Sequence, residues 1–568
     1  MSSNLYNAPG VEKRRAVDAQ DFMAVILVGY GDNLHPFNED TKVVPKALLP
    51  VGNVPIINSV LNWVLDSGLT DILIVAPPLA YSAVHHHLQE HYSVSTHPRA
   101  RIDLKRLTDG EKDEDEKESD IDVSKGGQKE GTARILRRFR AMIKSDFILL
   151  PCDLLPPTSL PLSSILDKHR ATPTAVLTSV FYEPVPSIKE AEQKVLIAID
   201  KETQELLMIE NLMALEEDLS LRTTLLALHP TLSLSTRLID AHIYVFRRTI
   251  LDLLATRRSK DLDSMKEQVV PWLVKGGWQR ALGERWAPIL NPPRRDPLAS
   301  ALGRSTAAHI PSAAAYAYPS RGSSSGSDHT PPPMNLPTSP NPDDGEDLSA
   351  FKEALAANIH APAKRNSHGR RKYPGWKCQV IITAPELETP PPSGKAAKGK
   401  PKAASEPDYL IRANNLPAYW ELNRRFLRSM AISSTPSIPT PPSPRNAVSG
   451  VVSEDTHSTV TPISPSAQIS PDSLIGEGTR VGERASIKKS VIGRHCVIGK
   501  GAKITGCVLW DFASVEENAR VENAILGNNV RIGEKSTIKD CELGTRFEAK
   551  PGSNLKNEKL VAGQEASS

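Results

Sequence analysis

The sequence predicts a protein of two folded parts, an α/β domain in the first half and a parallel β-helix near the C-terminus. Short aliphatic runs alternate with helical stretches from residue 22 onward, which is typical of an α/β domain. From residue 473 onward, aliphatic residues recur with a period of seventeen. The chain has 568 residues, which is too long for one core, so at least two cores joined by linkers are expected.

The α/β prediction rests on strands that are apolar on both faces. "MAVILVG", "DILIVAP", "FILLPCD" and "TAVLTSVFYE" are such runs, and they are typical of a parallel sheet covered by helices. The first helix is expected to end at Gly68 and to bury one stripe of side chains, namely Ile56, Val60, Trp63 and Val64. We expect this domain to span residues 22–290.

Pro-, Ser- and Gly-rich composition predicts that the segments between the folded parts are flexible linkers, because such stretches bury too little apolar surface to offset chain entropy. A strand and a helix are expected between two of these linkers, at 375–430, with a basic Pro-rich insert at 389–407. The predicted flexible segments are an N-terminus at 1–21, linkers at 291–374 and 431–470, and a tail at 557–568.

The C-terminal repeat advances in steps of six, six and five residues, so that positions 475, 492, 509, 526 and 543 are equivalent. Three short strands per coil would form a triangular prism with one aliphatic residue per side pointing inward. Glycine follows many of these positions, where a sharp corner excludes a Cβ atom. The pattern resembles the hexapeptide-repeat left-handed β-helix, expected here over 471–556, whereas an antiparallel sheet would alternate with period two. Some β-helices of this kind use a catalytic His, but we interpret His495 as a surface residue.

Charge and cysteine content exclude several functional classes. The net charge of +3, from 69 basic and 66 acidic residues, gives no reason to expect direct binding to nucleic acid or to a membrane. The acidic run 109–122 is expected to be a surface loop. Five cysteines without short spacing favour neither a disulfide framework nor a zinc site, and His85–His87 is interpreted as surface helix. Because the N-terminus also lacks an apolar signal region, we expect a cytosolic protein in the cytoplasm.

The stretch "LVGYGDNLHP", followed by "PKALLP", resembles the signature of the sugar-phosphate nucleotidyltransferases, L-A-G-G-x-G-T-R-L-x-P and P-K-x-x-x-P. That resemblance implies a Rossmann-like nucleotidyltransferase fold. Gly29 and Gly31 retain the glycines that allow a phosphate to approach the backbone closely, and Lys46 retains the cation. Further along, "EGTA" with Gly131 resembles the G-T-A segment of the family, and Asp153 ends a strand where the family places a metal-binding Asp.

The departures from this signature lie at the positions that matter most for the reaction. One glycine is missing, Asp32 takes the Thr position and Asn33 takes the Arg position. A carboxylate and a neutral amide thus replace the groups that would face a triphosphate. We therefore predict a degenerate site with no catalytic residue, no metal and no cofactor. What remains is a vestigial nucleotide pocket at Gly29, Gly31, Lys46, Gly131 and Asp153. The alternative is an active nucleotidyltransferase of the GDP-mannose pyrophosphorylase type.

A nucleotidyltransferase-like domain followed by a left-handed β-helix is also the layout of the gamma and epsilon subunits of eukaryotic translation initiation factor 2B. The segments "PKALLPVGNVP", "LIDAHIYVF", "VVPWLV" and "RANNLPAYWELNR" look like those of the gamma subunit. The epsilon subunit carries a further helical exchange domain after its β-helix, for which the dozen or so residues after Leu555 leave no room.

This resemblance implies an accessory subunit of a guanine-nucleotide exchange factor. Its partners would be the epsilon subunit, the other subunits of initiation factor 2B, and the GTPase translation initiation factor 2. A stand-alone scaffold unrelated to translation is the other alternative.

Overall fold

The computed structural model describes ten parts of the chain, which form two compact units, Met1–Lys275 with Lys377–Ser568, and Gly276–Trp376. The predicted N-terminus, nearly all of the acidic loop and of the linker 291–374, and the whole insert 389–407 lie outside the described residues. The described residues are 22–38, 44–109, 130–184, 194–214, 219, 221–256, 262–292, 375–383, 408–433 and 463–563.

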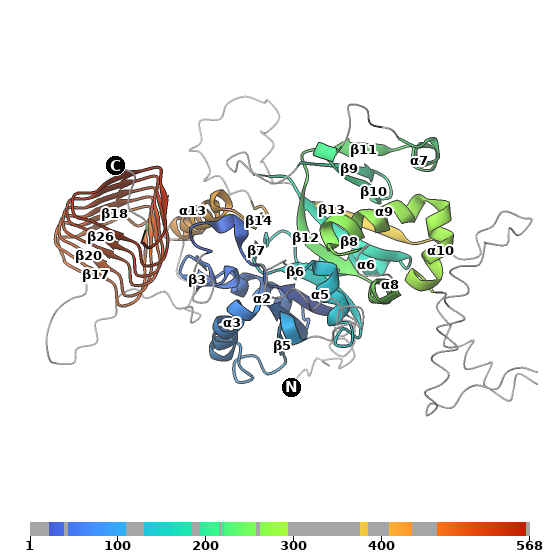
Figure 1. Ribbon diagram of the computed structural model, residues 1–568, viewed down its shortest axis with the longest axis horizontal. Coiled ribbons are helices and arrows are strands. Elements are labelled where there is room, and N and C mark those ends of the chain that lie inside the picture. Colours follow the sequence, from blue (N-terminus) through green and yellow to red (C-terminus); the bar gives the residue numbers. More distant parts are fainter. Residues whose placement is uncertain are drawn as a thin grey trace, which may run out of the picture. The chain divides into compact units, whose positions relative to one another are not determined.

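In the described part of the first unit, a seven-stranded sheet has the order β13-β8-β12-β6-β1-β4-β5 (Figure 1). Strands β6, β1, β4 and β5 run parallel to one another, and β13 is parallel to β8. The bounds are β1 Phe22–Leu27, β4 Asp71–Ala76, β5 Arg101–Arg106, β6 Asp146–Pro151, β8 Ala175–Tyr182, β12 Ile239–Phe246 and β13 Lys377–Thr383.

The four strands that the hydrophobic runs predicted, β1, β4, β6 and β8, all point in the same direction. The sheet is nevertheless not wholly parallel, because β12, which those runs did not predict, runs antiparallel to both of its neighbours, β6 and β8. The physical reason is that burial on both faces produces a continuous apolar run whichever way a strand points. Every residue of β8 is buried, for example. Hydrophobic pattern therefore carries no information on the direction of a buried strand.

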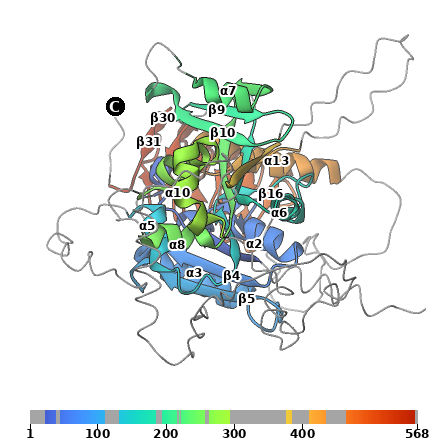
Figure 2. The same ribbon diagram turned by 90° about the vertical axis from the view of Figure 1, so that its right-hand side faces the viewer.

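Helices cover the sheet, and the first of them has the predicted buried stripe. In α2 (Ile57–Asp66), Val60, Trp63 and Val64 are buried, as is Ile56 just before it. Gly68 has φ of +85° and donates its N–H to the Leu65 carbonyl at 2.9 Å, as expected of a glycine that ends a helix. The next helix, α3 (Pro78–His91), packs against β4 and β5 (Figure 2).

The remaining helices and small sheets complete the described α/β region. A three-stranded antiparallel sheet has the order β10-β9-β11. Its strands are β9 Val195–Asp200, β10 Leu206–Asn211 and β11 Leu232–Ser235. The other helices of this region are α5 Thr132–Arg138, α6 Leu162–Ala171, α7 Thr223–Leu228, α8 Thr249–Thr256, a π-helical turn Met265–Val269 and α9 Val270–Trp278.

Two further helices, α10 and α13, lie outside the α/β region described above. In the second unit, α10 spans Arg280–Leu290. The Trp376 ring lies so close to Gly276 that a Cβ atom on Gly276 would be only 2.3 Å from Trp376 Cζ2. In the first unit, α13 (Leu416–Ser433) is the helix expected within 375–430. None of the helices in the described ranges is both long enough and apolar enough to cross a membrane.

The C-terminal region is a stack of parallel strands in three sheets, which within the described residues have six, six and five strands (Figure 1). The predicted register holds, since Ile475, Ile492, Leu509, Leu526 and Leu543 pair in sequence and the column continues to Leu560. The inward aliphatic residues form one core. This is the predicted β-helix.

The stack is longer than predicted at both ends. Its first strand, β15 (Gln468–Ile469), lies inside the predicted linker 431–470, and its last, β31 (Lys559–Leu560), lies inside the predicted tail 557–568. The terminal coils lack the full aliphatic pattern, so they were not recognised. The strands between are β16 Leu474–Ile475, β17 Arg480–Val481, β18 Ser486–Lys488, β19 Val491–Ile492, β20 Val497–Ile498, β21 Lys503–Thr505, β22 Val508–Leu509, β23 Ser514–Val515, β24 Arg520–Glu522, β25 Ile525–Leu526, β26 Arg531–Ile532, β27 Thr537–Lys539, β28 Glu542–Leu543, β29 Glu548–Ala549 and β30 Asn554–Lys556.

The glycines after the inward residues are needed for close approach between coils. A Cβ on Gly493 would lie 2.5 Å from the carbonyl carbon of Trp510 in the next coil. The left-handed corner positions are different residues, such as His495 (φ 52°) and Phe512 (φ 61°), which are seventeen apart and stack with ring centroids 5.3 Å apart. The expected exclusion of a Cβ atom is confirmed, but its cause is the neighbouring coil.

Candidate functional site

The loop after β1 brings the two retained glycines against Lys46. Gly31 has φ of +81° and precedes the short 3-10 helix η1 (Asp32–Leu34). A Cβ on Gly31 would lie 3.5 Å from Lys46 Cβ, and one on Gly29 would lie 3.8 Å from Lys46 Cδ. Lys46 begins a second 3-10 helix, η2 (Lys46–Leu48). Only Gly31 therefore needs to be glycine for its backbone conformation.

Lys46 and Asp153 form a buried ion pair with 2.6 Å between Lys46 Nζ and Asp153 Oδ2. Their side chains are only 8% and 1% exposed. Lys46 Nζ also donates to Asn414 Oδ1 at 2.9 Å. On the other side of the carboxylate, Arg412 Nη2 lies 3.3 Å from Asp153 Oδ1. The two retained charged residues are thus held by each other and by two residues from much later in the chain.

The surroundings of Asp153 decide its protonation state. Burial raises the pKa of the Asp153 carboxyl, but the positive charges of Arg412 and Lys46 outweigh burial and lower this pKa to about 2. Asp153 is therefore an anion at neutral pH. Its charge is already matched by two cations, which leaves little reason for it to attract a further one.

A short strand places Arg412 beside Asp153, and Asn414, which contacts Lys46, follows directly after this strand. Strand β14 (Ile411–Arg412) pairs antiparallel with β7 (Leu154–Leu155), which directly follows Asp153. The N–H of Ala413 donates to the Asp153 carbonyl at 2.8 Å. This segment was predicted as part of the strand and helix at 375–430 and by its resemblance to the gamma subunit, but its two polar side chains were not predicted as site residues. Their signal was the run "RANN" just before an amphipathic helix.

Gly131 lies at the start of α5, away from the Lys46 pair. A Cβ there would lie 2.3 Å from Asp263 Cγ, and the next residue, Thr132, accepts a hydrogen bond from the Met265 N–H at 2.9 Å. Glu130 pairs with Arg138 at 2.7 Å. Of the five residues predicted for the pocket, the structure brings four together, and it packs Gly131 against a different segment.

His242 is a further group near this site that sequence reasoning did not find. It has φ of +56°, a strained conformation for a residue other than glycine. Its N–H donates to Asp240 Oδ1 at 2.8 Å, while its buried Nε2 has no hydrogen-bond partner within the described structure. Burial, followed by the positive charges of Arg412, Lys266 and Lys46, holds the pKa of His242 well below its usual value. The imidazole is therefore neutral.

The two substituted positions of the signature lie at the surface of the loop. Asp32 and Asn33 are both exposed. Burial, then the negative charges of Glu130 and Asp32, raise the pKa of the Tyr30 phenol, which places those carboxylates close to the loop. Negative charge at this position repels a triphosphate. Across the ranges that the structure describes, no group of three His, Cys, Asp or Glu residues is arranged to hold a metal ion.

Residues of the same loop share a core with α13 and the β-helix. Phe37 lies against Trp510, with ring centroids 4.8 Å apart. Trp510 Nε1 donates to the Tyr419 hydroxyl at 2.9 Å, and that hydroxyl donates to the Pro50 carbonyl at 2.5 Å. This core also holds Leu34, Leu49, Ile56, Leu422, Val491, Val508 and Ile525.

The other histidines that the sequence analysis considered have structural places. His85–His87 lies in α3, as predicted, but His87 is buried and its Nε2 lies 2.7 Å from Asn58 Oδ1. Within this helix His87 is the member of the run that turns toward α2. His495 stacks on Phe512 at a corner of the β-helix.

Comparison with known proteins matches both parts of the chain. Residues 23–277 match the nucleotidyl transferase family, and residues 456–555 match the family described as EIF2B subunit epsilon LbH domain. The chain is 28% identical over 270 residues to the translation initiation factor eIF2B subunit gamma of Schizosaccharomyces pombe, which covers 47% of this chain and 54% of that protein. The match thus spans about half the length of this curated relative. The chain is therefore similar to an eIF2B gamma subunit, and a region that matches the nucleotidyl transferase family is followed by one that matches an LbH domain of the eIF2B epsilon type.

Proposed function

We propose that this protein is an accessory, gamma-type subunit of the exchange factor eIF2B, and that it promotes GDP-to-GTP exchange on translation initiation factor 2 together with a catalytic epsilon subunit. The similarity to an eIF2B gamma subunit and the LbH match support this proposal. In this role the nucleotidyl transferase domain acts as a scaffold, since function resides in sites and not in folds.

One structural observation carries the proposal, the closed network around Asp153. A nucleotidyltransferase needs its cation and carboxylate free for a triphosphate and its metal ion. Here Lys46 and Asp153 pair with each other at 2.6 Å, and Asn414 and Arg412 take up their remaining contacts. The chain's own side chains thus occupy the groups that a substrate would need.

The loop itself supports a degenerate site. Loss of one well-placed donor typically lowers the rate of an enzyme about 10²-fold or more. Asn33 replaces a cation, and the exposed Asp32 adds a negative charge beside it. In our proposal Gly29, Gly31, Lys46 and Asp153 persist because they hold the loop, η2 and β14 together.

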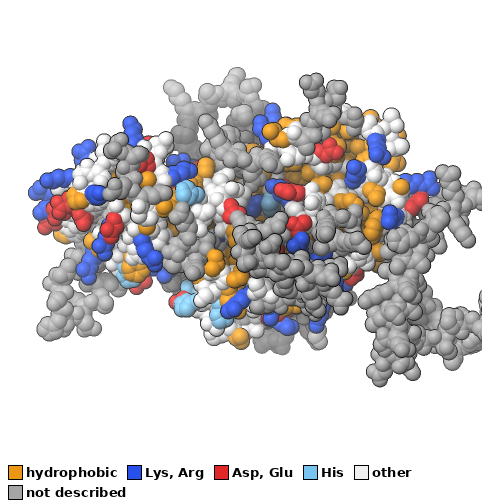
Figure 3. Space-filling view, in the orientation of Figure 1, with side chains coloured by type: hydrophobic (Ala, Val, Ile, Leu, Met, Phe, Trp, Pro, Cys, Tyr) orange, Lys and Arg blue, Asp and Glu red, His pale blue; other side chains and the backbone are white. Residues whose placement is uncertain are grey.

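The proposed partners are proteins. On the face shown in Figure 3, Lys and Arg side chains of the β-helix are interspersed with Asp and Glu side chains. Lys500 pairs with Glu483 at 2.9 Å across adjacent coils, for example. Such mixed charge does not favour nucleic acid, which selects basic stripes. We propose the epsilon subunit, the other eIF2B subunits and initiation factor 2 as partners, in the cytosol.

Affinity purification of the tagged full chain from a native lysate tests the subunit proposal. We expect an epsilon-type subunit to co-purify in stoichiometric amount and to persist at moderate salt. Recovery of the chain without any exchange-factor subunit would contradict the proposal and favour a scaffold unrelated to translation.

An active sugar-phosphate nucleotidyltransferase is the second candidate, because Lys46 and Asp153 are both present and residues 23–277 match that family. Incubation of the chain with GTP, mannose 1-phosphate and Mg²⁺ tests it. We expect no pyrophosphate above the level of a heat-denatured control. The double substitution Asp32→Thr, Asn33→Arg restores the Thr and the Arg of the family signature, and we expect no gain in triphosphate binding, since the Asp153 network stays closed.

A further inference from the structure

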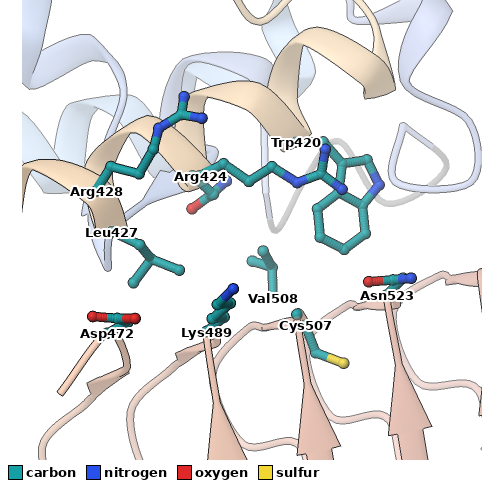
Figure 4. A pocket seen from close by; sticks show the side chains of 11 residues that line it. Trp420, Arg424, Leu427, Arg428, Asp472, Lys489, Cys507, Val508 and Asn523 are labelled. Atoms are coloured by element: carbon teal, nitrogen blue, oxygen red, sulfur yellow. The ribbon is translucent and has the colours of Figure 1, made fainter. Parts of the chain in front are cut away.

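A cavity of about 430 Å³ lies between α13 and one corner of the β-helix (Figure 4). Its size lies within the range of roughly 300–1,000 Å³ that is usual for small-molecule sites. Trp420, Arg424 and Leu427 of α13 line one wall. Lys489, Gly506 and Asn523 line the other. The cavity is separate from the Lys46 and Asp153 network, and its lining residues belong to other elements.

The floor of the cavity follows one corner column of the β-helix. Lys489, Gly506 and Asn523 are seventeen residues apart and have φ of 48°, 65° and 48°. Lys489 and Asn523 are two coils apart, which corresponds to a distance of about 10 Å along the stack. Gly506 has no side chain, and Asn523 Oδ1 lies 2.7 Å from where a Cβ on Gly506 would be. The column continues with Asp540 and Asn557, so Lys489 is its one long side chain within the described coils.

Positive charge in the cavity is only partly balanced. Within the described structure neither Arg424 nor Lys489 forms an ion pair, and the Arg424 guanidinium lies 5.5 Å from the centre of the Trp420 ring. A third cation, Arg428, is paired with Glu421 at 2.5 Å. Asp472 is the carboxylate that lines the cavity. The unpaired cations thus exceed the acidic groups by one, which favours an anionic ligand.

The rest of the lining selects a ligand with a planar apolar part. Leu427 and Val508 lie on opposite walls between the polar ends (Figure 4). Trp420 and Asn523 lie at the same end, together with the Arg424 guanidinium over the Trp420 ring. Asn523 Nδ2 donates to Asp540 Oδ1 at 3.1 Å, and its Oδ1 can accept a hydrogen bond from the edge of a heterocycle.

Cys507 also lines the cavity, but burial raises the pKa of its thiol to about 12, and Sγ donates to the Thr505 carbonyl at 3.2 Å. A neutral, hydrogen-bonded thiol is a poor nucleophile, so covalent capture is not expected.

We propose that this cavity binds a nucleoside monophosphate, with the base against Trp420 and Asn523 and the phosphate between Arg424 and Lys489. The ligand would join α13 to the β-helix and stabilise that contact. This inference does not depend on the proposed function, because it uses neither the exchange reaction nor the loop after β1.

Isothermal titration of the purified full chain tests the proposal, with GMP and AMP as probes and with guanosine, ribose 5-phosphate and inorganic phosphate as fragments. We expect a nucleotide to bind with one site per chain, and each fragment to bind at least about tenfold more weakly. Absence of binding by both nucleotides at millimolar concentration would overturn the proposal. Binding of inorganic phosphate as tightly as GMP would overturn the role of the base.

A matched pair of substitutions locates the site. Lys489→Asn removes the cation at a left-handed position where asparagine is well tolerated, as at Asn523 in the same column. Lys535→Asn makes the same change at an exposed left-handed corner (φ 54°) outside the cavity. We expect Lys489→Asn and Arg424→Gln to weaken nucleotide binding at least about tenfold, while Lys535→Asn leaves it unchanged. Equal binding by Lys489→Asn and Lys535→Asn would place the ligand elsewhere and refute the assignment. Melting temperatures of all variants verify that each is folded.

Discussion

Arg412 and Asp153 are 259 positions apart in the chain, yet Arg412 Nη2 lies 3.3 Å from Asp153 Oδ1 in a buried ion pair. This contact ties the segment that leads into α13 to the end of a central strand. It also pairs the Asp153 carboxylate with a cation of the same chain. The same contact therefore has a structural role and an effect on chemistry, and it can be tested for both.

Removal of this arginine should destabilise the fold. In Arg412→Ala, Asp153 keeps only Lys46 as a counter-ion in a site that is nearly inaccessible to water. Breaking a buried ion pair usually costs about 3 kcal/mol or more. We expect a clear fall in the melting temperature of the full chain. The control is Arg101→Ala, because the Arg101 side chain is 76% exposed and its loss should change little. Equal melting of both variants would show that the pair contributes nothing.

The pH dependence of stability follows from the low pKa of Asp153. This pKa is about 2 in the folded state, against about 3.9 in an unfolded chain. The pair therefore stabilises the fold fully above pH 4, and this stabilisation, roughly 2–3 kcal/mol, is lost as the pH falls toward 2.

Wild type and Asp153→Asn, melted between pH 7 and pH 2, should show this effect. The variant lacks the titrating carboxyl, so the stability gap between the two proteins should narrow in acid. Asp167→Asn, at a side chain that is 68% exposed, serves as the control. A gap that stays constant from pH 7 to pH 2 would contradict the assignment.

The hydrogen bond from Trp510 to Tyr419 should couple the β-helix to α13. The donor and acceptor are 2.9 Å apart and buried. A double-mutant cycle with Trp510→Phe and Tyr419→Phe should give a coupling energy of about 1 kcal/mol in the free energy of unfolding. Strictly additive effects would mean that the two parts of the chain do not share this contact in solution.

Substitution of a glycine between coils should lower the stability of the protein much more than substitution of a glycine at a corner. In Gly493→Ala, the new methyl group would meet the backbone of Trp510 at 2.5 Å, and overpacking of this kind destabilises by about 1–3 kcal/mol. In Gly552→Asn, the position has φ of 73° and open space around it, so asparagine should be nearly neutral. Thermal melting of the two variants distinguishes them, and a neutral Gly493→Ala would disprove the packing explanation.

Local pattern predicted much of this fold, and the limits of that prediction are physical. A seventeen-residue period placed inward residues such as Ile492 and Leu509 correctly, because each coil repeats the same contacts. The direction of β12 was not predictable, since buried strands look alike in either direction.

The candidate site was predictable only in part. The signature located Gly29, Gly31 and Lys46, because they lie close together in sequence. Arg412 and His242 were missed, because their role depends on long-range contacts and on a strained backbone conformation that no local pattern encodes.

Release of labelled GDP from purified translation initiation factor 2 tests the central claim most directly. Three samples are compared: this chain alone, an epsilon subunit alone, and the two together. The account predicts that this chain alone is inert and that the pair releases GDP faster than the epsilon subunit alone. If the pair is no faster than the epsilon subunit, and the chain instead forms pyrophosphate from GTP and mannose 1-phosphate, the protein is an enzyme and the account is wrong.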